Sequence, residues 1–92
     1  LQRKAEILRQ HPDLQITLEG HCDERGSLEY NMALGQRRAE STKRYLTQLG
    51  LSGDMFSTVS FGEERPVAQG HNEQAWAQNR RAEFVLNNLD AM

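Results

Sequence analysis

The sequence predicts an α+β fold, an α/β sandwich in which helices pack on one face of a sheet. Helix-like and strand-like segments alternate along the 92 residues, in the order helix, strand, helix, strand, short helix, strand. The first and last strand-like segments have apolar residues at every second position, which is typical of strands with one buried face. The longest helix-like segment carries a single apolar stripe, which suits a helix lying on such a sheet.

The first half of the chain is predicted to form two helices and one strand. Apolar residues recur at helical spacing over residues 1–10, and this helix ends before Pro12 because proline forces the preceding residue out of the α region. The first strand is predicted over residues 14–18. The long helix follows over residues 29–49, with Ser27 as its N-cap and Gly50 as the left-handed residue after its end.

The long helix is expected to bury one stripe against the sheet, formed by residues at steps of three and four: Ala39, Thr42, Leu46 and Leu49. The second strand is predicted over residues 55–61, a loop over 62–72 and a short helix over 73–78. Trp76 in that helix is expected to lie in the core under a loop. The third strand is predicted over residues 81–86. A helix with no strand before it predicts that another strand precedes Leu1 and pairs within the sheet.

Composition limits the possible functions. The length allows one domain, residues 1–92, and the absence of an initial Met indicates a piece of a longer protein. The net charge of −2 and the pI of about 5.9 argue against nucleic-acid binding. A single cysteine, Cys22, excludes an internal disulfide. The three histidines and Cys22 show no paired spacing, so we expect neither a metal site nor a cofactor.

Residues 20–39 contain the candidate binding site. An apolar strand leads into a polar loop with Asp23 and Arg25, and the following helix carries Asn31, Leu34 and Arg38. Opposite charges therefore converge where a strand ends and a helix begins. An arginine can hold a carboxylate with two parallel hydrogen bonds, and Asp23 is a natural partner for an ammonium group. This pattern suits a small zwitterionic ligand.

Each candidate also has a structural alternative. Asp23 could be a turn residue. Arg38 could form an ion pair with one of three glutamates: Glu19, Glu24 or Glu83. Asn31 could close the loop by bonding to the backbone, Arg25 could be a solvated charge and Leu34 a core residue. One of the two arginines Arg80 and Arg81 is expected to pair with carboxylates across the sheet, and the pair is expected to serve structure or partner binding rather than ligand contact.

The sequence offers no convincing catalytic group. His21 and Cys22 are neighbours at a strand end, where successive side chains point to opposite faces, so they do not form a nucleophile and its base. Cys22 is expected to be a small, half-buried residue at the loop entrance. We therefore predict a binding protein rather than an enzyme.

Four segments, in order, resemble the OmpA-like peptidoglycan-binding domain, and the likeness covers nearly all 92 residues. They are EGHCDERG at 19–26, EYNMALGQRRA at 29–39, VSFGEERP at 59–66 and NRRAE at 79–83. Long motifs in the right order are more specific than any short pattern. The resemblance implies two helices on one side of a mixed four-stranded sheet, whose first strand is absent here.

The resemblance also implies a function and a set of site residues. It implies non-covalent binding of the peptidoglycan stem peptide, chiefly through diaminopimelate. The family's ligand residues fall on five positions: Asp23, Arg38, Asn31, Leu34 and Arg25. The spacing of 15 positions between the loop aspartate and the helix arginine (38 − 23) agrees with the family pattern.

The loop HCDERG is most similar to the lipid-anchored members of the family. For these, the resemblance implies a periplasmic domain tethered to the outer membrane by an N-terminal lipid, which lies outside this chain, and a second partner in the β-propeller protein of the Tol system. Two alternatives remain open. One is the wall-binding domain of a porin-like or flagellar-stator protein, and the other is a periplasmic protein–protein interaction module.

Overall fold

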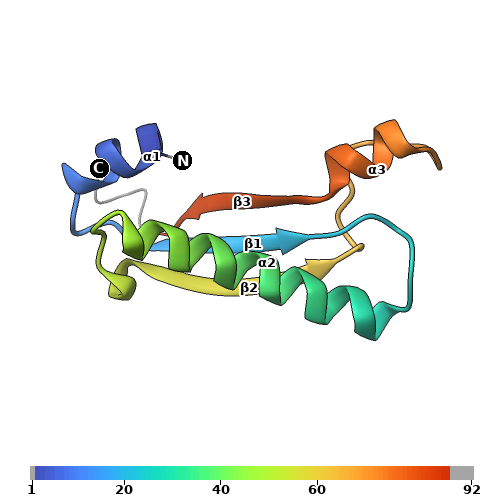
Figure 1. Cartoon of the computed structure of the whole chain (residues 1–92), viewed down its shortest axis with the longest axis horizontal. Coiled ribbons are helices and arrows are strands. Elements are labelled where there is room, and N and C mark those ends of the chain that lie inside the picture. The colour runs from blue at the N-terminus through green and yellow to red at the C-terminus, as the bar shows by residue number, and fades with distance from the viewer. Residues whose placement is uncertain (1, 88–92) are drawn as a thin grey trace.

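The computed structural model describes residues 2–87 and confirms the predicted order of elements (Figure 1). A short 3-10 helix, η1, precedes the second strand and has no counterpart among the predicted segments. The elements are α1 (Gln2–Arg9), β1 (Ile16–His21), α2 (Leu28–Gln48), η1 (Gly53–Met55), β2 (Phe56–Gly62), α3 (Glu73–Asn79) and β3 (Arg81–Leu86). None of the described helices is long and apolar enough to cross a membrane.

The three strands form one mixed sheet in the order β2-β1-β3. The central strand β1 pairs in parallel with β2 and antiparallel with β3. Helix α2 runs along the sheet and packs on β1 and β2, whereas α1 and α3 lie at opposite ends of the molecule (Figure 1). This arrangement confirms the predicted fold class. Within residues 2–87, β2 and β3 are the edge strands, and the further strand expected before Leu1 stays a prediction.

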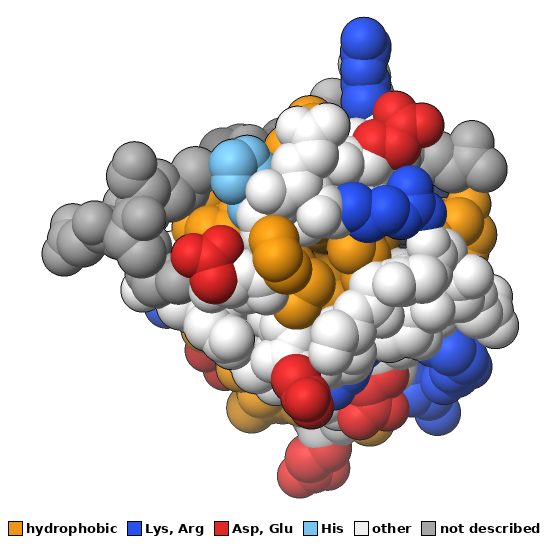
Figure 2. Space-filling view, turned by 90° about the vertical axis from the view of Figure 1, so that its left-hand side faces the viewer, with side chains coloured by type: hydrophobic (Ala, Val, Ile, Leu, Met, Phe, Trp, Pro, Cys, Tyr) orange, Lys and Arg blue, Asp and Glu red, His pale blue; other side chains and the backbone are white. Residues whose placement is uncertain are grey.

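The core lies between α2, α1 and one face of the sheet. Side chains of β1 alternate between buried and half-buried positions, and Ile16 and Leu18 are fully buried among the core residues. Of the stripe predicted on α2, Ala39 and Leu46 are buried, and Thr42 and Leu49 are half-buried. Figure 2 looks onto the end of the molecule where α1 lies and shows apolar side chains at the surface among charged ones.

Two glycines allow α2 to approach the sheet very closely. A Cβ added to Gly20 of β1 would overlap the carbonyl oxygen of Gly35 in α2 and would lie 3.0 Å from the Cα of Gly35. The helix backbone therefore touches the strand backbone, with no side chain between them. This contact sets the height of α2 above the last residues of β1, where the candidate site begins.

The ends of α2 are as predicted. The Ser27 side chain accepts a hydrogen bond from the backbone N–H of Tyr30, as an N-cap does. Gly50 follows the helix with a φ of +97°, in the left-handed region that glycine adopts without strain. The loop from β1 is thus tied to the first turn of α2 at a defined point.

Candidate functional site

Asp23 is the centre of the site, in the loop between β1 and α2. Its side chain is 8% exposed, and two arginines surround its carboxylate. The backbone N–H and the Nε of Arg25 donate to Oδ1 at 2.9 and 3.1 Å, and the Nη2 of Arg25 donates to Oδ2 at 2.9 Å. The Nη1 of Arg80 also donates to Oδ2, at 3.1 Å. One buried anion thus joins the loop to Arg80, the residue between α3 and β3.

These hydrogen bonds hold the pKa of Asp23 well below its usual range. The side chain of Arg25 has the largest effect, and burial of the carboxylate opposes it. The backbone N–H of Arg25 and the side chain of Arg80 lower the pKa further. Asp23 is therefore a carboxylate at neutral pH.

Both arginines are held in place from their outer sides. The guanidinium of Arg25 lies over the ring of Trp76, 4.3 Å from the ring centroid. The Nη2 of Arg80 donates to Glu73 at 2.7 Å. Within residues 2–87, the Nη1 of Arg25 has no protein acceptor. An oxygen of a ligand can bind there without displacing any bond to Asp23.

The carboxylate and its arginines lie in a cavity of about 350 Å³. This volume is within the range of small-molecule sites. The residues that line the cavity come from the loop, the first two turns of α2 and the junction between α3 and β3: Cys22, Asp23, Arg25, Gly26, Tyr30, Asn31, Leu34 and Arg80. Four of the five residues predicted to bind ligand are therefore brought together: Asp23, Arg25, Asn31 and Leu34.

Asn31 both closes the loop by hydrogen bonding and lines the cavity. Its side chain is 1% exposed and lines the cavity. Its Nδ2 donates to a carboxylate oxygen of Glu63 at 2.8 Å and, more weakly, to the backbone carbonyl of Asp23 at 3.4 Å. The amide thus holds the loop to the helix and forms part of the cavity wall.

The fifth predicted residue, Arg38, is elsewhere. Its Nη1 donates to the backbone carbonyl of His21 and lies 3.9 Å from the sulfur of Cys22. Arg38 is not among the residues that line the cavity, and within the described chain it forms no ion pair with Asp23. The expected convergence of opposite charges therefore does not bring Arg38 to Asp23. The carbonyl at the end of β1 lies nearer to Arg38 than the carboxylate does.

Two features of the site were not anticipated. Arg80 pairs with a carboxylate, that of Asp23, but it also lines the cavity, whereas no ligand contact was expected of it. Its contact spans 57 positions of sequence, so local patterns do not reveal it. Trp76 was expected in the core, but it is only half-buried and supports Arg25. The only sequence signal for a site at this place is the two adjacent arginines, Arg80 and Arg81, after a short helix.

Cys22 is more buried than expected and is not an activated nucleophile. The residue is 3% exposed, and its thiol donates to the backbone carbonyl of Asn31 at 3.2 Å. Burial raises the pKa of the thiol, although Arg38 opposes this effect. A buried thiol with a raised pKa is a poor nucleophile.

The pairing of Asp23 predicts how stability depends on pH. Because its pKa is lower in the folded than in the unfolded protein, Asp23 stabilises the fold above about pH 4, the ordinary aspartate pKa, and this contribution is lost as the pH falls further. We expect the free energy of unfolding, measured with urea between pH 6 and pH 2, to fall less in Asp23→Asn than in the wild type.

The control for this measurement is Asp54→Asn, because Asp54 is exposed and forms no ion pair in the described chain. Its stability should follow the wild-type pH profile. Parallel profiles for the wild type and Asp23→Asn would show that the two arginines do not stabilise the folded state through this carboxylate.

Comparison with known proteins identifies the family. The sequence profile of the OmpA family matches residues 1–80. The chain is 61% identical over 70 residues to a peptidoglycan-associated lipoprotein of Pseudomonas aeruginosa, an alignment that covers 76% of this chain and 42% of that protein. The chain spans about half the length of the curated relatives it matches.

Solved structures agree with this result. The crystal structure of the peptidoglycan-associated lipoprotein from Burkholderia pseudomallei superposes with a TM-score of 0.88 at 50% identity, covering 94% of this chain and 73% of that one. The C-terminal domain of Helicobacter pylori MotB shares the fold, with a TM-score of 0.85 at 24% identity and coverage of 94% and 67%. The match over residues 1–80, together with 61% identity to a curated member, shows that the chain belongs to the OmpA family.

Proposed function

We propose that this domain binds peptidoglycan non-covalently by holding the diaminopimelate residue of a stem peptide in the Asp23 cavity. The observation that supports this most strongly is the buried carboxylate of Asp23 between Arg25 and Arg80, in a cavity of about 350 Å³. The names of the relatives, peptidoglycan-associated lipoproteins, point to the same polymer.

The chemistry of the cavity matches a free amino-acid end, which has an ammonium and a carboxylate on one carbon. The ligand carboxylate would accept from the free Nη1 of Arg25 and from Arg80, and its ammonium would donate to Asp23. Leu34 and Tyr30 would contact the aliphatic part of the ligand. Arg38 would join the ligand carboxylate if its guanidinium turned away from the His21 carbonyl on binding.

We further propose that the domain anchors the outer membrane to the cell wall as a component of the Tol-Pal type. In this proposal an N-terminal lipid outside this chain holds the protein at the outer membrane, the domain lies in the periplasm, and the β-propeller protein of the Tol system is a second partner. The identities of 61% and 50% to peptidoglycan-associated lipoproteins favour this assignment. A catalytic role is not proposed, because the buried thiol of Cys22 is not activated.

A co-sedimentation experiment with purified sacculi tests the proposed function. We expect the wild-type domain to sediment with the insoluble wall and to be released by free diaminopimelate. Glu40→Gln, which changes an exposed residue of α2 outside the cavity, should sediment like the wild type. A wild-type domain that stays in the supernatant, or that is not displaced by diaminopimelate, would contradict the proposal.

A further inference from the structure

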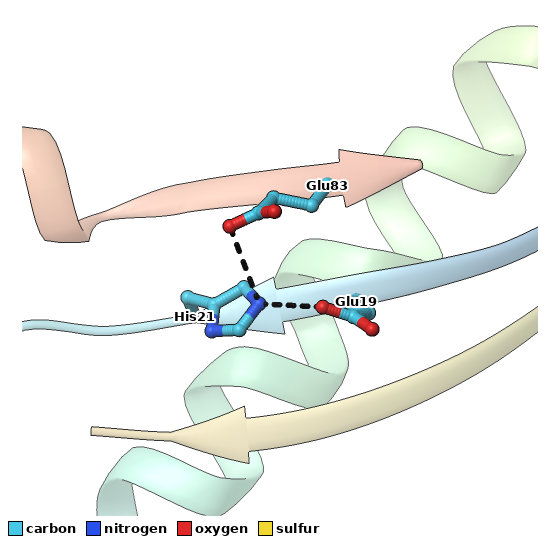
Figure 3. Close-up of side chains that lie close together, drawn as sticks. All are labelled: Glu19, His21 and Glu83. Atoms are coloured by element: carbon cyan, nitrogen blue, oxygen red, sulfur yellow. Dashed lines mark hydrogen bonds and ion pairs between the residues drawn. The ribbon is translucent and has the colours of Figure 1, made fainter. Parts of the chain in front are cut away.

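A second group of polar side chains lies on the face of the sheet away from α2. Glu19 and His21 lie on β1, and Glu83 lies on β3 directly opposite Glu19 in the antiparallel register. Figure 3 shows all three side chains in front of the strands, with the ribbon of α2 behind the sheet. This group shares no residue with the Asp23 cavity.

Both carboxylates approach the same ring nitrogen. The Nε2 of His21 lies 3.0 Å from Oε1 of Glu19 and 3.8 Å from Oε2 of Glu83. Like charges directly opposite each other across two strands repel, so this arrangement calls for a positive charge between them. A metal ion at Nε2 can supply it, and Arg81, which pairs with Glu83, is the cation that competes with such an ion.

The imidazole is fixed in this orientation. His21 is 1% exposed, and its ring stacks on Phe61 with centroids 5.5 Å apart. The other ring nitrogen, Nδ1, is buried and has no hydrogen-bond partner in the described chain. Buried polar atoms of this kind are rare in proteins. The side chain therefore has one functional edge, Nε2, and that edge points at the two carboxylates.

The donor atoms lie close enough together to hold one metal ion. Zinc ligands at 2.0–2.1 Å in tetrahedral geometry are separated by about 3.3 Å. The two distances from Nε2, 3.0 and 3.8 Å, lie on either side of this value, and all three donor atoms lie within 4.8 Å of one another. Two carboxylates and a neutral imidazole also balance the charge of a divalent cation.

We propose that Glu19, His21 and Glu83 form a binding site for a divalent transition metal of the zinc class, with water as the fourth ligand. A metal at Nε2 would relieve the repulsion between the carboxylates and would tie β1 to β3. The proposal does not depend on peptidoglycan binding. It differs from the expectation based on His and Cys spacing, because its third donor is 62 positions from His21 (83 − 21) and is brought there by strand pairing.

Arg81 is the competing cation at this site. Its Nε donates to Oε2 of Glu83, while its Nη1 and Nη2 donate to the backbone carbonyls of Asn79 and Arg65 at 3.1 and 2.8 Å. These two carbonyls hold Arg81 without Glu83. The carboxylate of Glu83 is 43% exposed and can turn toward a metal while Arg81 stays in place.

Calorimetric titration of chelator-treated domain with zinc chloride tests this proposal. We expect one zinc ion to bind per chain, and Co²⁺ to give the visible absorption of a tetrahedral site. Glu83→Gln and Glu19→Gln should each weaken zinc binding on the order of tenfold or more. These isosteric changes are preferred to substitution of the buried His21, which could prevent folding.

His71→Gln is the matched control, because His71 is an exposed histidine paired with a different carboxylate, Glu24. It should bind zinc like the wild type. The proposal would be overturned if the wild type bound no zinc at equimolar concentration, or if His71→Gln abolished binding and Glu83→Gln did not. Either result would leave Arg81 as the cation that neutralises this group, through its pairing with Glu83.

Discussion

Replacing Gly20 by alanine will destabilise the domain by about 3 kcal/mol or more, as overpacking does when neither side can yield. The added methyl group would overlap the backbone carbonyl of Gly35, so β1 and α2 must separate. Because the overlap is with backbone, no side-chain rotation can relieve it, and the loss of stability should be larger than for an ordinary core substitution. Urea denaturation followed by circular dichroism measures it.

Two other glycines serve as controls. An alanine at Gly35 would overlap the hydroxyl of Ser60, which can rotate, and would lie 3.0 Å from the carbonyl oxygen of Gly20, which must shift slightly, so we expect a loss smaller than that for Gly20→Ala. An alanine at Gly53 would make only ordinary contacts at 3.8 Å and should change stability by less than about 0.5 kcal/mol. A Gly20→Ala domain as stable as the wild type would mean that α2 does not approach β1 as closely as described.

Replacing Asp23 by alanine will weaken binding of a diaminopimelate-containing stem peptide by about 2–4 kcal/mol, the cost of leaving buried charges without a partner. Arg25 and Arg80 would lose the carboxylate that aligns them, and the ligand ammonium would lose its acceptor. Titration calorimetry with the soluble peptide measures the change. Asp23→Asn keeps the shape of the side chain and should show most of the same loss.

Glu73→Gln is the matched control for this measurement. It removes the other carboxylate that pairs with Arg80, yet Glu73 is exposed and does not line the cavity. Its affinity should stay close to that of the wild type. Equal affinities for the wild type and Asp23→Ala would mean that this cavity does not bind the stem peptide.

Arg38→Ala distinguishes two arrangements of the bound state. A loss equal to that of Asp23→Ala would mean that the guanidinium leaves the His21 carbonyl and holds the ligand. An unchanged affinity would mean that Arg25 and Arg80 are the cations that hold it. The stability of Arg38→Ala, measured in parallel, separates a lost ligand contact from a displaced β1.

The parts of the fold that follow from local patterns were predictable. The alternation in residues 81–86 predicted β3 with its observed bounds, and Ser27 and Gly50 marked the ends of α2. The start of β1 was placed two residues early, because Leu14 is apolar and buried but its N–H bonds to His11 in a turn. The three residues of η1 are too few to show a period.

The sequence predicted only those site residues that lie in one continuous segment of the chain. Asp23, Arg25, Asn31 and Leu34 lie within one strand–loop–helix unit, and the structure brings them to one cavity. Arg80 is the residue between α3 and β3, and its approach to Asp23 depends on the pairing of β3 with β1 and on α3. Arg38 had the expected position on its helix, but a backbone carbonyl was a nearer acceptor than the carboxylate. Which acceptor an arginine bonds depends on distances in the folded protein, which the sequence pattern does not give.

Chemical-shift mapping by NMR can show whether the Asp23 cavity recognises diaminopimelate. Adding a soluble stem peptide that carries diaminopimelate to the ¹⁵N-labelled domain should shift the backbone amides that surround the cavity, including those of Asp23, Arg25, Asn31 and Arg80. The same peptide ending in alanine in place of diaminopimelate should leave these amides unchanged. Shifts confined to the open face of the sheet around Glu19 and Glu83, or identical shifts with both peptides, would contradict the claim that this cavity recognises the zwitterionic end of the stem peptide.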